Sequence, residues 1–325
     1  MATRSSVVKS LKLAAYLLAS SIALEVAGYP KPGNVHRLRD FSDTVFEDFL
    51  VTAVIAEHYM FRAAVRGCRV VQGYTPALLV CDFIRATVAE ARMVSGGGNT
   101  CLGTALLLYP LAVASGYLLC SGRVLEASAV ASYAKSLLYR YSTALDSVEF
   151  YKAVRVASPS YIKSSDATEE FPNVWDKEFK VKLLSKNYRL WDVLSYSAKN
   201  DIVCREVVEG YVRSLRNASF LSTRLQEHGS WNLAVVETYL YQLAHDTDTL
   251  IARKHSIDAA KQVSERAKDV LNLCLSSQGS HCLEALKTFD QELIEKNINP
   301  GSSADIVASS IALYAIQKKS SILRP

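Results

Sequence analysis

The chain has 325 residues, half of them hydrophobic, and its 37 basic and 32 acidic residues give a formal net charge of +5 at pH 7. This length suits one or two domains with a sizeable core and excludes a disordered chain. Only 14 glycines and 8 prolines are present, too few for the frequent turns of an all-β sandwich or barrel. The charges form no basic block, so we expect no nucleic-acid partner. The composition favours an all-α fold.

The first predicted helix lies close to the N-terminus. Its apolar side chains recur at helical spacing from Val7 to Ile22. Basic residues precede the apolar stretch 13–24, as in a signal peptide, but Glu25 and a proline-rich loop follow it, which favours a core helix. No other segment contains about 18 uninterrupted apolar residues, so we expect no membrane span.

Helical patterns continue to the end of the chain. Capping residues, apolar periodicity and glycine stops predict helices over residues 42–64, 75–94, 99–116, 123–141, 145–157, 201–225, 230–253, 256–275, 283–296 and after Pro300. The segment 99–116 is almost wholly apolar and predicts a buried central helix. The polar stretch at about 158–187 predicts a loop excursion or lid. We expect one large domain over residues 1–325, with ligand-binding loops at the helix ends.

Seven cysteines are dispersed along the chain without a CxxC pair or a short Cys/His cluster. This spacing indicates neither a zinc site nor a disulfide framework. We therefore expect mostly buried, reduced thiols in a cytoplasmic protein.

The first polar cluster follows the first helix. Glu25 precedes a loop that carries Lys31, Gly33, His36 and Arg37, and Asp40 lies just beyond it. Two prolines and a glycine stiffen this loop, so its side chains would lose little entropy on binding a ligand. An ordinary helix-ending loop with solvated charges is an equally good explanation.

The second cluster begins the predicted central helix. Gly96, Gly97 and Gly98 precede Asn99 and Thr100, so the first amides of the helix could contact a phosphate. The spacing matches neither the Walker pattern nor GxGxxG. A glycine C-cap followed by an Asn/Thr N-cap explains the pattern about as well.

The third cluster is the sequence His245-Asp246-Thr247-Asp248, with Arg253 about one turn later. Paired carboxylates suit a Mg²⁺ ion that also bridges substrate phosphates, and Arg253 could neutralise those phosphates. Solvated carboxylates or helical salt bridges with Arg253 are the alternative.

The fourth cluster begins the last helix, where Gly301, Ser302 and Asp305 follow Pro300. Ser302 and Asp305 have the spacing of a capping box, which predicts a helix start. The same residues would offer amides, a hydroxyl and a carboxylate to a ligand.

In this order, the four clusters resemble the triphosphoribosyl-dephospho-CoA synthase family. The matching stretches are EVAGYPKPGNVHR from Glu25, GGNTCLG from Gly97, DTDTLIARK from Asp246 and PGSSAD from Pro300. The chain departs from the usual bacterial PKPGLVD-like motif at Asn34 and His36, and it carries Ser303 where a second glycine is usual. The region 151–199 could not be matched.

The resemblance implies an all-helical transferase with two small-molecule substrates, ATP and dephospho-CoA or a related nucleotide. A ribose hydroxyl of dephospho-CoA displaces adenine from ATP and leaves an α-linked triphosphoribosyl group. Lys31, Asn99, Asp246, Asp248 and Asp305 are implied at the nucleotide site. Neither the physiological acceptor nor the oligomeric state is implied, and a homo-oligomer is compatible with the sequence.

This chemistry assigns expected roles to the clusters. Glu25, Asp40 and Asp305 are candidates to deprotonate the hydroxyl or stabilise an oxocarbenium-like centre, and His36 is a candidate to hydrogen-bond the leaving adenine. Lys31, Arg37 and Arg253 would bind the triphosphate with Mg²⁺ held by Asp246 and Asp248. The remaining candidates offer backbone or side-chain contacts to the nucleotide, namely Gly33, Gly97, Gly98, Asn99, Thr100, Gly301 and Ser302.

Two other classes stay open. His245-Asp246 in an all-α protein is also similar to the HD-type metal phosphohydrolases, although that site needs further ligands and His58, His228 and His255 are not obviously convergent. A non-catalytic helical binding module is the third hypothesis, and no heptad pattern supports it.

Overall fold

The computed structural model describes residues 4–159, 170–276 and 280–324, and these contain fifteen helices and no strand. The expected all-α fold is confirmed. The helices are α1 (Arg4–Val26), α2 (Phe46–Val71), α3 (Cys81–Ser95), α4 (Leu102–Cys120), α5 (Ala127–Tyr141), α6 (Ala144–Ala157), α7 (Phe179–Ser185), α8 (Leu190–Ser197), α9 (Ile202–Glu209), α10 (Val212–His228), α11 (Trp231–His245), α12 (Thr249–Lys254), α13 (Ile257–Ser276), α14 (Ser280–Glu295) and α15 (Gly301–Lys318).

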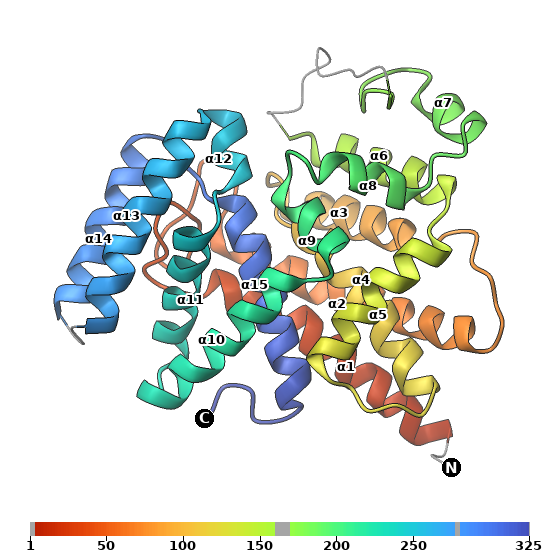
Figure 1. Cartoon of the computed structure of the whole chain (residues 1–325), viewed down its shortest axis with the longest axis horizontal. Helices are drawn as coiled ribbons and strands as arrows, with labels where there is room; N and C mark the ends of the chain where they lie inside the picture. Colours follow the sequence, from red (N-terminus) through yellow and green to blue (C-terminus); the bar gives the residue numbers. More distant parts are fainter. Residues whose placement is uncertain (1–3, 160–169, 277–279, 325) are drawn as a thin grey trace.

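Helix α4 forms the centre of the molecule and packs against α1, α2, α5 and α15 (Figure 1). Nearly all of its residues are buried, as its composition predicts. Glycines allow α2 and α4 to approach closely. A Cβ atom on Gly67 would lie 2.0 Å from the carbonyl oxygen of Val113, and one on Gly116 would lie 1.8 Å from that of Ala64. Any side chain at these positions would force the two helices apart.

Two helices are long and apolar enough to cross a membrane by length and composition alone. The window in Leu102–Cys120 is 83% buried, and the window in Ser5–Val26 is 44% buried. The core helix of a globular protein passes the same test, and both helices pack against other helices. These helices correspond to the apolar stretches expected at 13–24 and 99–116, and passing this test does not itself indicate a membrane span.

The start of α3 differs from the predicted one because a distant carboxylate satisfies the terminal N–H groups. Helix α3 begins at Cys81 and not near residue 75. The reason is Asp146, whose carboxylate accepts hydrogen bonds from the backbone N–H groups of Leu79, Val80 and Cys81. The capping residue lies about 65 positions away, beyond the reach of local sequence signals.

The predicted helices 201–225 and 230–253 are each broken into two. The first breaks at Gly210 and Tyr211, which both adopt positive φ, 88° and 65° respectively. The second breaks at Asp246–Asp248, where Asp248 caps the short helix α12.

The first and last helices are neighbours, because α1 packs against α15. This contact brings the end of α1 (Val26) and the start of α15 (Gly301), which are far apart in the sequence, to the same region. On the flanks of the molecule, α13 and α14 form one hairpin, and α6, α7 and α8 form a second group (Figure 1). Of the predicted loop at 158–187, residues 160–169 lie outside the described residues, residues 170–178 are irregular and α7 follows them.

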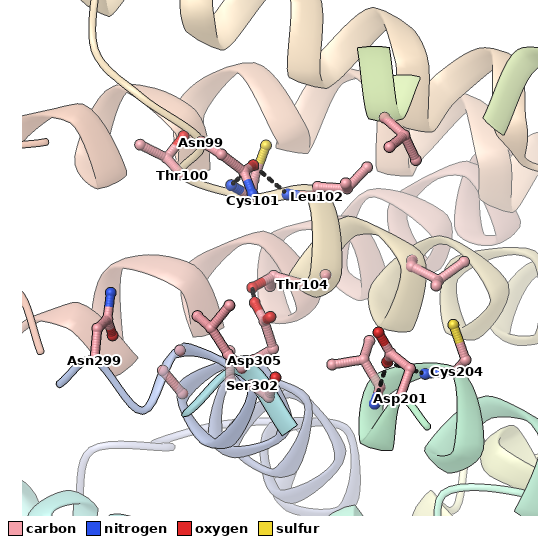
Figure 2. A pocket seen from close by; sticks show the side chains of 18 of the residues that line it. Asn99, Thr100, Cys101, Leu102, Thr104, Asp201, Cys204, Asn299, Ser302 and Asp305 are labelled. Carbon is pink, nitrogen blue, oxygen red and sulfur yellow. Dashed lines mark hydrogen bonds between the residues drawn. The ribbon is translucent and has the colours of Figure 1, made fainter. Parts of the chain in front are cut away.

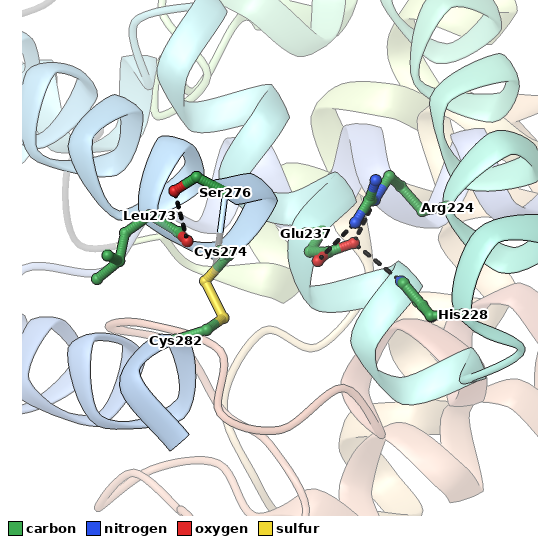
Figure 3. Close-up of a disulfide and its surroundings, with 7 residues drawn as sticks. All are labelled: Arg224, His228, Glu237, Leu273, Cys274, Ser276 and Cys282. Atoms are coloured by element: carbon green, nitrogen blue, oxygen red, sulfur yellow. Dashed lines mark hydrogen bonds and ion pairs between the residues drawn. A yellow bond between two sulfur atoms is a disulfide. The ribbon is translucent and has the colours of Figure 1, made fainter. Parts of the chain in front are cut away.

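Two disulfides are present, contrary to the expectation of mostly reduced thiols. Cys68 and Cys120 join α2 to the end of α4, with Cα atoms 5.2 Å apart, and Cys274 and Cys282 join α13 to α14, with Cα atoms 4.7 Å apart. The second pair is drawn in Figure 3, beside a cluster in which Glu237 of α11 accepts hydrogen bonds from two residues of α10, Arg224 and His228. The three remaining cysteines, Cys81, Cys101 and Cys204, are buried free thiols.

Candidate active site

A cavity of about 740 Å³ lies where the N-termini of α4, α9 and α15 converge (Figure 2). Its wall includes Glu25 at the end of α1 and Asp305 near the start of α15. The positive ends of three helix dipoles therefore face one space. This volume is within the usual range for small-molecule sites.

Asp305 is the central carboxyl of the cavity. The hydroxyl of Thr104, in the first turn of α4, donates a hydrogen bond to Asp305 Oδ1 at 2.5 Å (Figure 2). Burial raises the pKa of Asp305 to about 7, because desolvation and the negative charges of Glu25, Asp201 and Asp248 outweigh this hydrogen bond. A carboxyl group with such a pKa can accept or donate a proton near neutral pH.

Gly103 allows Asp305 to reach this position. A Cβ atom on Gly103 would lie 2.1 Å from Asp305 Oδ2. Even alanine at position 103 would therefore displace the carboxylate or the helix. The GGNTCLG stretch thus begins α4 and also, through Gly103, allows α4 and α15 to approach closely.

A buried ion pair supports the wall beside Asp305. Lys31 Nζ lies 2.5 Å from Glu25 Oε1, and the Lys31 side chain is fully buried. Burial raises the pKa of Glu25 and lowers the pKa of Lys31, while the attraction between the two opposes both shifts. The charge of Asp305 also acts on Lys31. Glu25 lines the cavity, and Lys31 supports it from behind.

Part of the loop after Lys31 is anchored by Asp290 of α14, while Asn34 and Val35 of the same loop line the cavity. Asp290 accepts hydrogen bonds from the N–H of Gly33 at 2.9 Å and from Arg39 Nε at 3.1 Å, and His36 Nε2 lies 3.5 Å from it. Burial raises the pKa of Asp290, but these partners outweigh burial, so the net pKa lies below its usual value. Neither Gly33 nor His36 lines the cavity, contrary to their expected roles, because both contact Asp290 instead.

Two further candidates of the first cluster also lie outside the cavity wall. Arg37 donates hydrogen bonds to the carbonyl of Ala27 and to Asn232 Oδ1. Asp40 accepts a hydrogen bond from the N–H of Phe46 at 2.9 Å, at the start of α2. Both residues therefore fit the alternative explanation of the first cluster, an ordinary helix-ending loop.

The residues of the glycine-rich cluster are split between the two roles considered for it, contact with a ligand and helix capping. Asn99 and Thr100 line the cavity, and Asn99 Oδ1 also caps α4 by accepting from the N–H of Leu102 at 3.0 Å. Gly97 and Gly98 do not line it. Cβ atoms on them would meet Asp48 Oδ2 at 2.5 Å and Asp43 Oδ2 at 2.9 Å, so these glycines allow the loop to pack on the start of α2.

The paired carboxylates of the third cluster do not converge. Asp246 accepts hydrogen bonds from Arg213 at 3.0 Å and Arg216 at 2.6 Å. Asp248 is buried and accepts from the N–H groups of Leu250 and Ile251 at the start of α12, and from both the N–H and the hydroxyl of Ser303 in α15. Burial raises the pKa of Asp248 against these hydrogen bonds.

These partners do not fit the expected magnesium site, since arginines and backbone amides already occupy the carboxylate oxygens. No group of three or more His, Cys, Asp or Glu side chains among the described residues is arranged to hold a metal ion. The expectation that Asp246 and Asp248 together bind Mg²⁺ is therefore corrected. The local sequence pattern does not distinguish a magnesium site from helix capping and salt bridges.

Arg253 is the one cationic side chain of the cavity wall among the described residues. It forms an ion pair with Asp201 at 3.0 Å and donates to the carbonyl of Asn200 at 3.0 Å. Gly301 and Ser302 at the start of α15 also line the wall, as expected. The cavity therefore brings together Glu25, Asn99, Thr100, Arg253, Gly301, Ser302 and Asp305 from the predicted set.

Residues 12–323 match the CitG family, described as ATP:dephospho-CoA triphosphoribosyl transferase. The match covers nearly the whole chain. The chain belongs to this family.

Individual relatives share shorter stretches with this family member. A 2-(5''-triphosphoribosyl)-3'-dephosphocoenzyme-A synthase from Klebsiella pneumoniae is 33% identical over 113 residues, which are 34% of this chain and 36% of the relative. The corresponding protein from Escherichia fergusonii is 34% identical over 99 residues, 30% of this chain and 31% of the relative. The alignments thus span about a third of the length of these curated relatives.

The fold of this CitG family member is also found in a solved structure. A protein from Archaeoglobus fulgidus, provisionally described as a triphosphoribosyl-dephospho-CoA synthase, superposes with a TM-score of 0.58 at 23% sequence identity. The match covers 82% of this chain and 98% of the other. The similarity shows that the two chains share a fold.

The family membership weakens the phosphohydrolase alternative, and the geometry does not favour it. His245 Nδ1 lies 2.8 Å from the carbonyl oxygen of Tyr241, and its ring packs against the Tyr241 ring. His58, His228 and His255 lie on three other elements or their ends. No described His/Asp group forms a metal cluster with His245.

Several residues of the cavity wall were missed by sequence reasoning. Thr104 follows directly on the matched GGNTCLG stretch and was the easiest to find. Asn200 and Asp201 precede α9, and Asp201 has the signature of an N-cap, since it accepts from the N–H groups of Val203 and Cys204. Tyr151 and Tyr196 lie in the unmatched region 151–199, where no motif marks them.

Proposed function

We propose that this CitG family member transfers the triphosphoribosyl group of ATP to a ribose hydroxyl of dephospho-CoA or a related nucleotide. The observation that supports the proposal is the hydrogen-bonded pair Thr104–Asp305. The Asp305 carboxyl group has a pKa of about 7 and lies in a cavity faced by three helix N-termini. The family description and the relatives' names support the choice of substrates.

In the proposed reaction, the acceptor hydroxyl oxygen forms a bond to the anomeric carbon of the ATP ribose. The bond from that carbon to adenine breaks, and its electron pair leaves with adenine. Asp305 takes the hydroxyl proton, while the departing adenine takes up one proton, so the overall proton count is conserved. The three phosphates stay attached because no phosphate bond breaks.

Positive charge develops on the sugar as adenine departs, and a carboxylate nearby stabilises it. Glu25 is placed for this role because it lines the cavity next to Asp305. Its ion pair with Lys31 fixes the carboxylate in one orientation, since the Lys31 ammonium group is buried and also donates to the Glu25 backbone carbonyl. Lys31 thus acts on the proposed reaction through Glu25.

The triphosphate requires positive potential, which the cavity supplies in two ways. The N-termini of α4, α9 and α15 direct their dipoles into it. Arg253 adds a formal charge, and its guanidinium group is held beside α9 by Asp201. We therefore place the phosphates near Arg253 and the sugar near Asp305. Asp246 and Asp248 do not fit a metal ion at this site, because arginines, backbone amides and Ser303 occupy their oxygens.

The test is incubation of the purified protein with ATP, MgCl₂ and dephospho-CoA. We expect free adenine by chromatography and an acceptor whose mass increases by one triphosphoribosyl group. Asp305→Asn should lower the rate at least 100-fold, because the amide cannot accept the hydroxyl proton. Asp258→Asn is the matched control, since Asp258 is an exposed carboxylate on α13 outside the cavity wall.

The outcomes separate the candidate functions. Adenine release without an acceptor mass shift would leave a glycosyl-cleaving activity and refute the transfer. Phosphate release from ATP without adenine would instead support the phosphohydrolase alternative. Full activity of Asp305→Asn would refute the assigned base.

A further inference from the structure

One region of the cavity wall is apolar and lies where the main core meets a smaller hydrophobic cluster. It consists of Phe150, Tyr151 and Val154 of α6, Val174 of the following loop, and Val193 and Tyr196 of α8, and we call it the apolar arm. Tyr151 and Val193 belong to a small hydrophobic cluster distinct from the main core. Helices α6 and α8, which lie on one flank of Figure 1, thus contribute one side of the cavity wall.

The wall of the apolar arm is held in a defined shape. The Tyr151 hydroxyl donates to the carbonyl of Pro172 at 2.9 Å, and its ring stacks on Phe179 at 5.6 Å between centroids. Arg155 donates to the carbonyl oxygens of Val174 and Asp176 at 2.6 and 2.7 Å. These contacts tie the loop after residue 170 to α6, so the arm is formed before any ligand arrives.

The arm contributes no charged side chain to the cavity, and the charged residues of the wall lie elsewhere, namely Glu25, Asp201, Arg253 and Asp305. All six of its side chains are uncharged, and three are aromatic, which suits the face of a flat, uncharged ring and would disfavour a phosphate. Ser197 and Asn200, at the end of α8, add a hydroxyl and an amide to the wall between the arm and Arg253. An amide side chain can pair with the ring nitrogen and amino group of adenine.

We propose that the apolar arm binds the adenine ring of a nucleotide substrate, and that α6 and α8 thereby select a purine. The proposal rests on the proposed function, because it assumes that a nucleotide occupies the cavity. Two sources share this chemistry, the adenine of ATP and the adenine of dephospho-CoA. The experiment below distinguishes them.

The test measures binding of each nucleotide alone by isothermal titration calorimetry. Val154→Leu extends a buried side chain into the arm and should weaken binding of the nucleotide whose adenine lies there at least tenfold. Val148→Leu is the matched control, since Val148 is equally buried on α6 but does not line the cavity. Unchanged melting temperatures would show that both variants are folded.

A second variant tests base selection directly. Tyr196→Leu keeps an apolar side chain but removes the aromatic face, so we expect the preference for ATP over CTP, or for dephospho-CoA over its cytidine analogue, to shrink at least fivefold. If Tyr196 had only a structural role, Tyr196→Leu would weaken the binding of purine and pyrimidine nucleotides equally. Such equal weakening would overturn the proposal.

Loss of ATP binding in Val154→Leu would assign the arm to the donor adenine, and loss of dephospho-CoA binding would assign it to the acceptor adenine. If neither nucleotide binds more weakly, the proposal is refuted, while triphosphoribosyl transfer by the wild-type protein would still uphold the proposed function. If the wild-type protein shows no transfer and Val154→Leu still weakens ATP binding, the proposed function fails. The assignment of the apolar arm to adenine is then upheld.

Discussion

At the scale of single residues, Asp305 and Thr104 determine what the cavity can do. Two short side chains from near the starts of α15 and α4 meet at 2.5 Å, and Gly103 leaves room for the contact. The hydrogen bond from Thr104 favours the ionised carboxylate, whereas burial favours the neutral form. The balance places the pKa of Asp305 at about 7, so its protonation changes near neutral pH.

Removing the Thr104 hydroxyl should therefore change the pH dependence of catalysis. In Thr104→Val, we expect the pKa of Asp305 to rise by about one unit, since a hydrogen bond to a charged group contributes about 1.5 kcal/mol or more. Activity that needs the ionised base would then fall roughly tenfold at pH 6.5 and recover at high pH. A pH profile of kcat/KM measures this shift, and Thr104→Ser should restore the wild-type profile. Identical profiles for Val and Ser would contradict the role of the hydroxyl.

The raised pKa of Asp305 also predicts a cost in stability. The unfolded chain releases this proton near pH 4 and the folded protein near pH 7, so the folded state binds more protons between these values. Stability contributed by the neutral carboxyl is thus present at low pH and lost as pH rises toward 7. Asp305→Asn should raise the free energy of unfolding by roughly 2–4 kcal/mol at pH 8.

The same substitution should bring a much smaller gain as the pH falls toward 4, because Asp305 is then neutral in the folded protein. Urea unfolding at pH 5 and pH 8 measures the two gains. A gain that does not depend on pH would contradict the assignment of a pKa of about 7.

At the scale of elements, the notable contacts are carboxylates that cap helices distant in sequence. Asp146 joins the starts of α3 and α6, and Asp248 joins the starts of α12 and α15. In each case one carboxylate satisfies N–H groups that a helix start leaves without an intrahelical partner. Asp248 thereby fixes the position of α15, which carries Asp305.

We expect Asp248→Ala to lower the free energy of unfolding by at least about 3 kcal/mol, because it leaves buried N–H groups of two helices without an acceptor. Asp246→Ala is the comparison, and its loss should be closer to 1 kcal/mol because its ion pairs are partly exposed. Urea unfolding of both variants measures the two losses of stability. Equal losses would show that Asp248 does not bridge the two helices as described.

At the scale of the whole molecule, α1 and α15 pack together and the two disulfides join positions that the chain order separates. Cys68 and Cys120 are 52 residues apart, and Cys274 and Cys282 are 8 apart. A cross-link restricts the unfolded chain more strongly when the loop it closes is longer. The two bonds should therefore contribute unequally to stability.

Loss of the Cys68–Cys120 bond should cost about 4 kcal/mol, and loss of the Cys274–Cys282 bond about 2.5 kcal/mol, by the entropy of loop closure. Paired Cys→Ser variants, unfolded in guanidinium chloride with and without reductant, measure each contribution. If a reductant leaves the unfolding of the wild type unchanged, the bonds are not present in solution.

Local patterns predicted most of the helices, although the helices over 201–225 and 230–253 proved to be broken. They also placed α4 in the core, because apolar periodicity and composition are properties of neighbouring residues. The order of four short motifs indicated the family, which the match over residues 12–323 confirms. Local patterns could not predict that α3 begins at Cys81, because its capping carboxylate comes from Asp146.

For the site, the sequence supplied candidate residue types and the tertiary structure decided between their roles. Glu25, Asn99, Arg253 and Asp305 line the cavity, whereas His36 and Asp246 engage partners far away in the chain. A motif records which side chains follow one another. Which partner satisfies a buried charge depends on helices that meet only when the core packs, and that packing alone determined the cavity, its apolar arm and the disulfides.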